Sequence, residues 1–136
     1  MRADNRAMPP LPEHAIILFA HGARDARWAQ TLQVLRAELL ARRQHARVEA
    51  AVLEFQAPSL EQALSDAVAA GCKRIDIAPV FWATGGHVTH DVPPMLETFR
   101  RTYPDVQVRM LPVLSELPGM TEFVADAVHA LAGKRA

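Results

Sequence analysis

The sequence predicts one α/β domain in which helices cover both faces of a four-stranded parallel sheet. Four short apolar runs alternate along the chain with four longer amphipathic segments, a pattern typical of repeated strand–helix–strand units. The chain has 136 residues, of which 50% are hydrophobic, enough for one core and too few for two ordinary domains. Because strand–helix–strand connections are right-handed, we expect a flavodoxin-like three-layer sandwich with strand order 2-1-3-4.

The apolar runs are the predicted strands, and the first two helices lie in the intervals between them. We expect the strands at residues 15–20, 48–53, 74–80 and 106–111. The first helix is expected over residues 26–43, where leucines and alanines recur at helical spacing. The second begins at Ser59, which can form a capping box with Gln62. It ends at Gly71, a residue type favoured just beyond a helix.

Prolines and glycines bound the last two helices. The third is expected from about Asp91 to Tyr103, because Pro93 and Pro94 are tolerated in a first helical turn and disrupt later turns. The fourth follows Gly119 and extends to about residue 131, with an apolar stripe along one side.

Several classes of protein and partner are disfavoured by the rest of the sequence. Residues 1–13 are expected to form a disordered leader before a domain at residues 14–133, and no apolar run approaches the roughly 20 residues that cross a bilayer. Fifteen Lys and Arg residues balance fifteen Asp and Glu residues, which argues against nucleic acid as a partner. The single cysteine, Cys72, is expected to be buried and fits a cytoplasmic protein.

Three candidate functional residues follow the ends of neighbouring predicted strands. His21 follows the first strand, Glu54 follows the second, and His87 lies in the loop after the third. Glu54 lies 33 residues after His21, and His87 lies 33 residues after Glu54 (54 − 21 and 87 − 54). Ligands bind beyond the carboxyl ends of parallel strands. Two imidazoles and one carboxylate suit a borderline divalent metal with open coordination positions. Taken singly, each histidine would more often be a hydrogen-bonded loop residue.

The segment that leads to the third helix adds candidates for ligand contact. Gly85 and Gly86 would let the backbone approach a large flat ligand, although an ordinary turn has the same pattern. Asp91 suits the N-cap of the third helix as well as a ligand partner. Phe81 and Trp82 could wall a planar ring or pack in the core.

Three segments together resemble the small CbiX-type sirohydrochlorin cobaltochelatases of cobalamin and sirohaem synthesis. They are Leu-Phe-Ala-His-Gly-Ala-Arg-Asp at residues 18–25, Val-Leu-Glu and Pro-Ser-Leu within residues 52–60, and Gly-Gly-His-Val-Thr-His-Asp-Val-Pro at residues 85–93. The Gly-Gly-His-Val segment is specific when it follows the His-Gly segment at this distance. The resemblance covers about residues 16–131 and implies a chelatase-like fold.

The resemblance also implies an activity and a site. The protein would be a metal chelatase, a lyase, that inserts a divalent metal ion as substrate into sirohydrochlorin or a related tetrapyrrole. Cobalt is expected, with nickel and iron open. His21 and His87 would bind the metal, with Glu54 either holding the ion or accepting a proton. A homodimer is implied, because larger chelatases carry two such domains in one chain. The alternative is a protein that binds metal or tetrapyrrole without catalysis.

Three residues in two segments depart from the family pattern. Ala23 stands where Ser is common, and Thr89 with His90 stands where Arg or Lys is usual. The missing serine removes a hydroxyl donor, and His90 is a candidate proton acceptor. Arg24 and Arg27 are candidates to bind the carboxylates of a tetrapyrrole.

Overall fold

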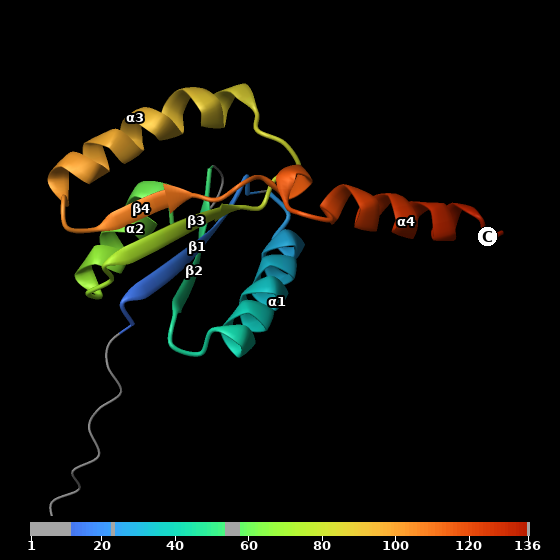
Figure 1. Ribbon diagram of the computed structural model, residues 1–136, viewed down its shortest axis with the longest axis horizontal. Coiled ribbons are helices and arrows are strands. Elements are labelled where there is room, and N and C mark those ends of the chain that lie inside the picture. Colours follow the sequence, from blue (N-terminus) through green and yellow to red (C-terminus); the bar gives the residue numbers. More distant parts are fainter. Residues whose placement is uncertain (1–11, 23, 54–57, 136) are drawn as a thin grey trace, which may run out of the picture.

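The computed structural model describes residues 12–22, 24–53 and 58–135, and among these every side chain except that of His87. Strands and helices alternate along this part of the chain (Figure 1). The strands are β1 (His14–Ala20), β2 (Arg47–Val52), β3 (Arg74–Pro79) and β4 (Gln107–Met110). The helices are α1 (Arg27–Arg42), α2 (Leu60–Ala69), α3 (Gly86–Thr102), the 3-10 helix η1 (Leu114–Glu116) and α4 (Met120–Ala132). None of the described helices is long and apolar enough to cross a membrane.

The four strands form one parallel sheet in the order β2-β1-β3-β4. The predicted strand order is therefore confirmed. Hydrogen bonds continue past the strand ends, since the Leu53 N–H donates to the Ala20 carbonyl at 2.9 Å and the Val80 N–H donates to the Phe19 carbonyl at 2.7 Å. The segments that follow β1, β2 and β3 consequently leave the sheet at one edge.

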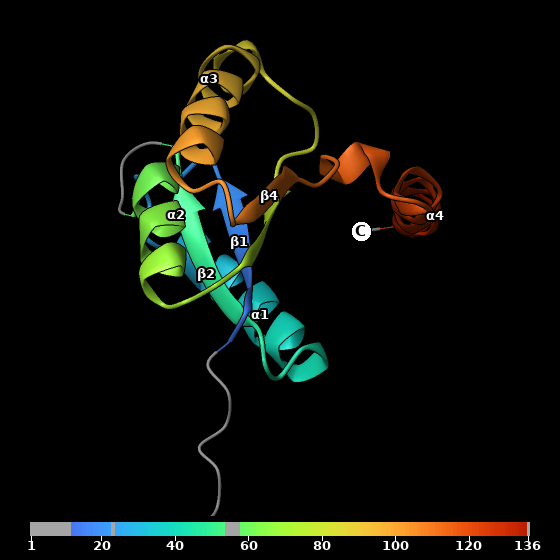
Figure 2. The ribbon, with the colours of Figure 1, turned by 60° about the vertical axis from the view of Figure 1, so that its left-hand side comes forward.

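Helices cover both faces of the sheet, to different extents. On one face, α2 and α3 enclose the larger core cluster, which includes Phe19, Leu64, Ile77 and Leu96. On the other face, α1 covers a smaller cluster around Leu32 (Figure 2). The predicted α/β sandwich is present, with its main core on the side of α2 and α3.

The start of α3 differs from the prediction. The helix begins at Gly86, not near Asp91, and holds Pro93 and Pro94 in its interior. An interior proline costs about 3 kcal/mol or more, because it lacks an N–H and clashes with the carbonyl four residues earlier. Four apolar side chains on one helix face offset this cost, at about 1.5–3 kcal/mol each on full burial. They are the buried residues Val88, Val92, Leu96 and Phe99. The prediction was wrong because it gave the prolines priority over this apolar repeat.

The ends of α2 agree with the prediction. The Ser59 hydroxyl accepts the Gln62 backbone N–H at 3.2 Å, while the Gln62 side chain bonds within the helix instead of returning to Ser59. Half of the predicted capping box therefore forms. Beyond the helix, Gly71 has a φ of +90°, which favours glycine. Cys72 is buried as expected, and burial raises the pKa of its thiol.

The last helix, α4, leads away from the sheet (Figures 1 and 2) and packs mainly against η1. Its predicted apolar stripe is present but does not face the core. Phe123, Val128 and Leu131 are 69%, 59% and 68% exposed. Because α4 does not fold back onto the sheet, α1 is the main helix on the face that carries the smaller core cluster.

The described chain begins at Pro12, close to the sheet. The Glu13 carbonyl accepts the backbone N–H groups of Lys73 at 2.7 Å and Arg74 at 3.1 Å. Glu13 is thereby joined to the start of β3. Residues 1–11 lie outside the described residues, so the disordered leader stays a prediction.

Candidate functional site

His21 lies at the carboxyl edge of the sheet, directly after β1, and its side chain is exposed. Its ring centroid is 4.6 Å from that of Phe81, and the ring planes are inclined at 44°. Phe81 is buried and packs edge-on against Phe19 of β1 at 5.3 Å. Beyond His21 the chain turns at Gly22, whose φ of +85° suits glycine. The imidazole thus has the core on one side and solvent on another.

The two aromatic residues after β3 have different roles. The segment is fixed by η1, since the Leu114 N–H donates to the Phe81 carbonyl at 2.9 Å and the Ser115 N–H donates to the Trp82 carbonyl at 3.0 Å. Phe81 is a core residue that supports His21, a role that sequence reasoning missed. Trp82 is 49% exposed and offers a flat apolar surface beside the site.

His87 lies in the first turn of α3, not in the loop where the sequence placed it. Its side chain lies outside what the structure describes. Gly85 is the N-cap, with a φ of −89°, and Gly86 is the first helical residue. A Cβ added at either glycine would meet no atom of the described residues within 4 Å. The fold does not require glycine at these positions, which leaves open space at the start of α3.

The three residues that follow Val88 have distinct surroundings. The Thr89 hydroxyl donates to the Gly85 carbonyl at 3.1 Å, so this side chain closes the first turn of the helix. Asp91 lies inside α3, so of its two expected roles the N-cap was wrong, because Gly85 takes that position, and the role of ligand partner stays a prediction. His90 is exposed, and its role as a proton acceptor stays a prediction.

The two arginines after β1 are not equivalent. The Arg27 guanidinium binds the Asp25 carboxylate, with Nε and Nη2 at 2.9 Å and 2.6 Å from Oδ2. Asp25 also accepts the Arg27 backbone N–H at 2.9 Å at the start of α1, and these contacts lower the pKa of Asp25. Arg27 would have to exchange this partner to bind a substrate. Arg24 is exposed and has an interaction of its own, so carboxylate binding by either arginine stays a prediction.

The third predicted metal ligand, Glu54, lies outside the described residues, as does Ala23. The hydrogen bond from Leu53 to Ala20 joins the residue before Glu54 to the residue before His21. Within residues 12–22, 24–53 and 58–135, no three His, Cys, Asp or Glu side chains come together as a metal site. The site formed by His21, Glu54 and His87 therefore stays a prediction.

A cavity of about 580 Å³ opens between α3 and the segment from β4 to η1. Apolar side chains such as Val92 and Leu111 line it, together with Thr84 and Thr89 on either side of the two glycines. His21 is not part of this lining. The cavity borders the start of α3, where the sequence predicts contact with a flat ligand.

The chain is similar in sequence to known chelatases. The CbiX family model matches residues 15–131. The sirohydrochlorin cobaltochelatase of Methanocaldococcus jannaschii is 37% identical over 82 residues, which are 60% of this chain and 57% of that protein. The match therefore spans less than two thirds of this relative.

Solved structures share the fold. A CbiX protein from Marinobacter aquaeolei VT8 has a TM-score of 0.71 and 30% identity, over 88% of this chain and 97% of that chain. The sirohydrochlorin chelatase SirB from Bacillus subtilis subspecies spizizenii, in complex with cobalt, has a TM-score of 0.66 and 26% identity, over 87% of this chain and 49% of SirB. SirB from Bacillus subtilis with Fe³⁺ has a TM-score of 0.71 and 25% identity, over 90% of this chain and 48% of that chain. From the family match and the shared fold we conclude that this chain belongs to the CbiX family.

Proposed function

We propose that this protein inserts divalent cobalt into sirohydrochlorin and that His21 and His87 bind the metal. The observation that carries the proposal is the position of His21, exposed at the carboxyl edge of a parallel sheet within the region that matches the CbiX family. Open parallel sheets bind ligands at this edge. The name of the Methanocaldococcus jannaschii relative supplies the proposed metal and substrate.

The chemistry sets two requirements, and imidazole and carboxylate groups are suited to both. Insertion replaces two pyrrole N–H protons of the macrocycle by one divalent cation, so the site must release the cation and accept two protons. A neutral imidazole binds the cation through a nitrogen lone pair, and the same nitrogen accepts a proton once the cation has moved to the ring. Glu54 either holds the ion or accepts a proton. An exposed site with open coordination positions favours transfer over retention.

The tetrapyrrole is proposed to lie against the start of α3. Gly85 and Gly86 leave space for a ring to approach the backbone. Trp82 offers an exposed aromatic face, to which a planar apolar ring can pack. Arg24 is the proposed partner of a peripheral carboxylate, because guanidinium and carboxylate groups form paired charge-assisted hydrogen bonds.

We also propose that two copies form the working unit. The match to cobalt-bound SirB covers 49% of that chain, a proportion that fits one of two paired copies. The exposed stripe of Phe123, Val128 and Leu131 on α4 is an apolar surface for that second copy to cover. Each such side chain contributes about 1.5–3 kcal/mol when fully buried. Light scattering should give twice the mass of one chain, and an active monomer would exclude this arrangement.

The choice of metal and the location complete the proposal. SirB has been solved with cobalt and with Fe³⁺, so iron is a competing substrate, and nickel remains open from the sequence. Cobalt is proposed because the curated relative is a cobaltochelatase. The reaction is proposed to take place in the cytoplasm.

The test is insertion followed by the absorbance of the tetrapyrrole, with Co²⁺, Ni²⁺ and Fe²⁺ supplied in turn under anaerobic conditions. We expect repeated turnover that is fastest with Co²⁺. His21→Ala and His87→Ala should fold and lose insertion, while the control His129→Ala, in the last turn of α4, should keep it. Stoichiometric binding without turnover would identify a binding protein instead. Full turnover in His87→Ala would remove His87 from the site.

A further inference from the structure

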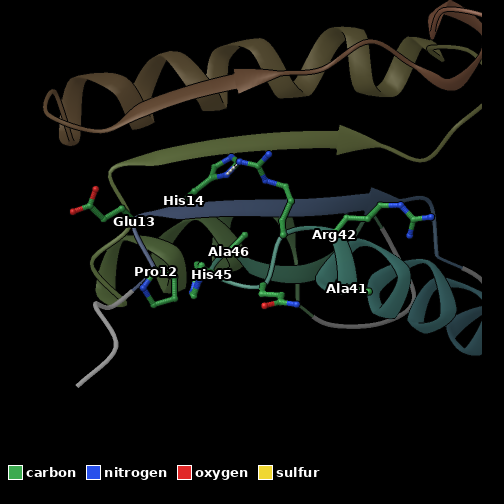
Figure 3. Close-up of a pocket in the computed structure, with 9 residues that line it drawn as sticks. Pro12, Glu13, His14, Ala41, Arg42, His45 and Ala46 are labelled. Carbon is green, nitrogen blue, oxygen red and sulfur yellow. Dashed lines mark hydrogen bonds between the residues drawn. The ribbon is translucent and has the colours of Figure 1, made fainter. Parts of the chain in front are cut away.

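We propose a second site, at the amino edge of the sheet, that binds a phosphate-type dianion between Arg43 and Arg74. This edge is remote from His21, because His14 opens β1 and Arg74 opens β3, whereas His21 follows the far end of β1. A cavity of about 800 Å³ opens at the amino edge (Figure 3). It is lined by residues 12–14 and by residues 41–46 at the end of α1.

The strand register brings the charged side chains of this site together. His14 lies beside Arg74, and Asp76 lies beside Arg109 of β4. Alternate residues of a strand share a face, so Arg74 and Asp76 point to the same side of the sheet. Arg43, the C-cap residue of α1, reaches this side as well, with Nη2 at 3.4 Å from His14 Nδ1.

Asp76 supplies a negative charge to this cluster, and both of its oxygens have partners. Oδ2 lies 2.7 Å from His14 Nε2, and Oδ1 accepts Arg109 Nε at 2.5 Å. The residue is only 4% exposed. Because an ionised carboxylate can only accept, Nε2 of His14 carries the hydrogen and Nδ1 is left as an acceptor. Asp76 is therefore already engaged by other groups.

Two guanidinium groups share that single acceptor. Arg74 Nη2 lies 3.2 Å from His14 Nδ1, next to Arg43 Nη2. One lone pair accepts one hydrogen bond fully, and a neutral imidazole balances neither positive charge. Among the described residues, neither arginine forms an ion pair with a carboxylate. The carboxylate of Glu13 lies at the rim and turns away from His14 (Figure 3).

The charge and shape of the cluster select the class of ligand. Arg43, Arg74 and Arg109 carry three positive charges against one negative charge on Asp76 and one on Glu13 at the rim, so the cluster keeps an excess of positive charge. Arg42 adds little, because its guanidinium already binds Glu38 at 2.7 Å. Arg43 and Arg74, which share His14 and have no described carboxylate partner, come from different elements. The oxygens of a tetrahedral dianion point in enough directions to bind both guanidinium groups with charge-assisted hydrogen bonds. A single planar carboxylate matches one guanidinium better than two.

The probe is inorganic phosphate, titrated into the full chain by calorimetry in a chloride buffer of constant ionic strength. We expect one saturable site per chain, with binding weakened about ten-fold or more in Arg43→Gln and in Arg74→Gln, since each removes charge-assisted hydrogen bonds. The matched control is Arg101→Gln, whose guanidinium pairs with Glu97 on α3; it should bind like the wild type. Proton resonances of the His14 ring should shift on phosphate addition, and those of His129 should not.

Three outcomes would overturn the proposal. They are no saturable phosphate binding by the wild type, equal affinity in Arg43→Gln and Arg101→Gln, or succinate binding as tightly as phosphate. Arg74→Gln alters a residue at a strand start, so circular dichroism checks its fold. If it does not fold, Arg43→Gln carries the test, because the Arg43 side chain is exposed. Metal insertion does not enter the readout, so this site and the proposed function fail independently.

Discussion

The ring of His21 rests on the ring of Phe81, with centroids 4.6 Å apart. Phe81 is itself held by an edge-on contact with Phe19, a central residue of the core. An exposed candidate ligand is thereby oriented by a buried side chain. Ligands that are held in place before the metal arrives bind it more tightly, because less freedom is lost on binding.

Replacing Phe81 with leucine should weaken metal binding. The smaller side chain removes the aromatic support of His21, and changes to groups that orient metal ligands cost about 10-fold or more in affinity. Cobalt affinity of Phe81→Leu, measured by calorimetry, should fall by about that factor. The control is Phe99→Leu, which alters a similarly buried ring of α3 and should lower stability without changing affinity. Equal cobalt affinity in the two variants would contradict the role of Phe81.

Replacing Gly86 with alanine should separate stability from substrate binding. Alanine is favoured over glycine by about 1 kcal/mol in a helix interior and by less at a first helical residue such as Gly86, and its Cβ would meet no described atom within 4 Å. Gly86→Ala should therefore unfold at an equal or higher denaturant concentration, while its KM for sirohydrochlorin rises. Gly71→Ala is the converse control, because its φ of +90° makes the substitution costly far from the site. An unchanged KM in Gly86→Ala would show that the ring does not approach this residue.

Replacing Asp76 with asparagine should lower stability in a pH-dependent way. Burial opposes ionisation of this carboxyl, yet hydrogen bonds from Arg109 and His14 outweigh burial and hold its pKa below the usual 3.8. A depressed pKa stabilises the fold above 3.8, and this contribution is lost as the pH falls through the folded-state value. Urea unfolding should show a loss of about 1–3 kcal/mol in Asp76→Asn near neutral pH.

The difference between Asp76→Asn and the wild type should shrink once the pH falls below 3.8. Asp105→Asn serves as the control, since Asp105 is exposed in the turn before β4, and should match the wild type throughout. A constant difference across the pH range would mean that the charge of Asp76 is not what stabilises this network.

A charged residue on the apolar stripe of α4 should separate the proposed dimer. Phe123 is 69% exposed, so Phe123→Asp should change the stability of one chain by no more than about 0.5 kcal/mol. Sedimentation velocity should show a weaker dimer, because an aspartate would have to be buried without a partner. Ala125→Asp, also exposed on α4, lies off the stripe and should leave the dimer intact. An unaffected dimer in Phe123→Asp would place the interface elsewhere.

The position of His21 at the carboxyl edge of the sheet could be predicted from the sequence. It depends only on the alternation of apolar runs with amphipathic segments and on the right-handed connection of parallel strands. The start of α3 could not be predicted, since local preference at Pro93 points to a later start and the burial of Val88 becomes evident only in the folded chain. The direction of α4 was missed for a related reason. An apolar stripe shows that one side of a helix needs cover, but it does not identify the surface that provides it.

The network around Asp76 had a signal that was passed over. A carboxylate in the middle of the apolar run at residues 74–80 is unusual, because a buried charge needs partners. Arg109, which lies beside Asp76 on the neighbouring strand β4, is one such partner. The contact with His14 also requires the register between β1 and β3, which the predicted strand order alone does not fix.

The two adjacent prolines of α3 leave its first turns with fewer backbone hydrogen bonds than its later turns. Pro93 and Pro94 have no N–H, so the carbonyls of Thr89 and His90 receive no hydrogen bond from the residues four positions later. The turn that carries His87 is consequently tied to the rest of the helix by fewer bonds than the turns that follow. Proline positions are where helices bend, so the His87 turn is the part of α3 that would tilt if the proposed ring binds there, while the later turns stay packed on the sheet.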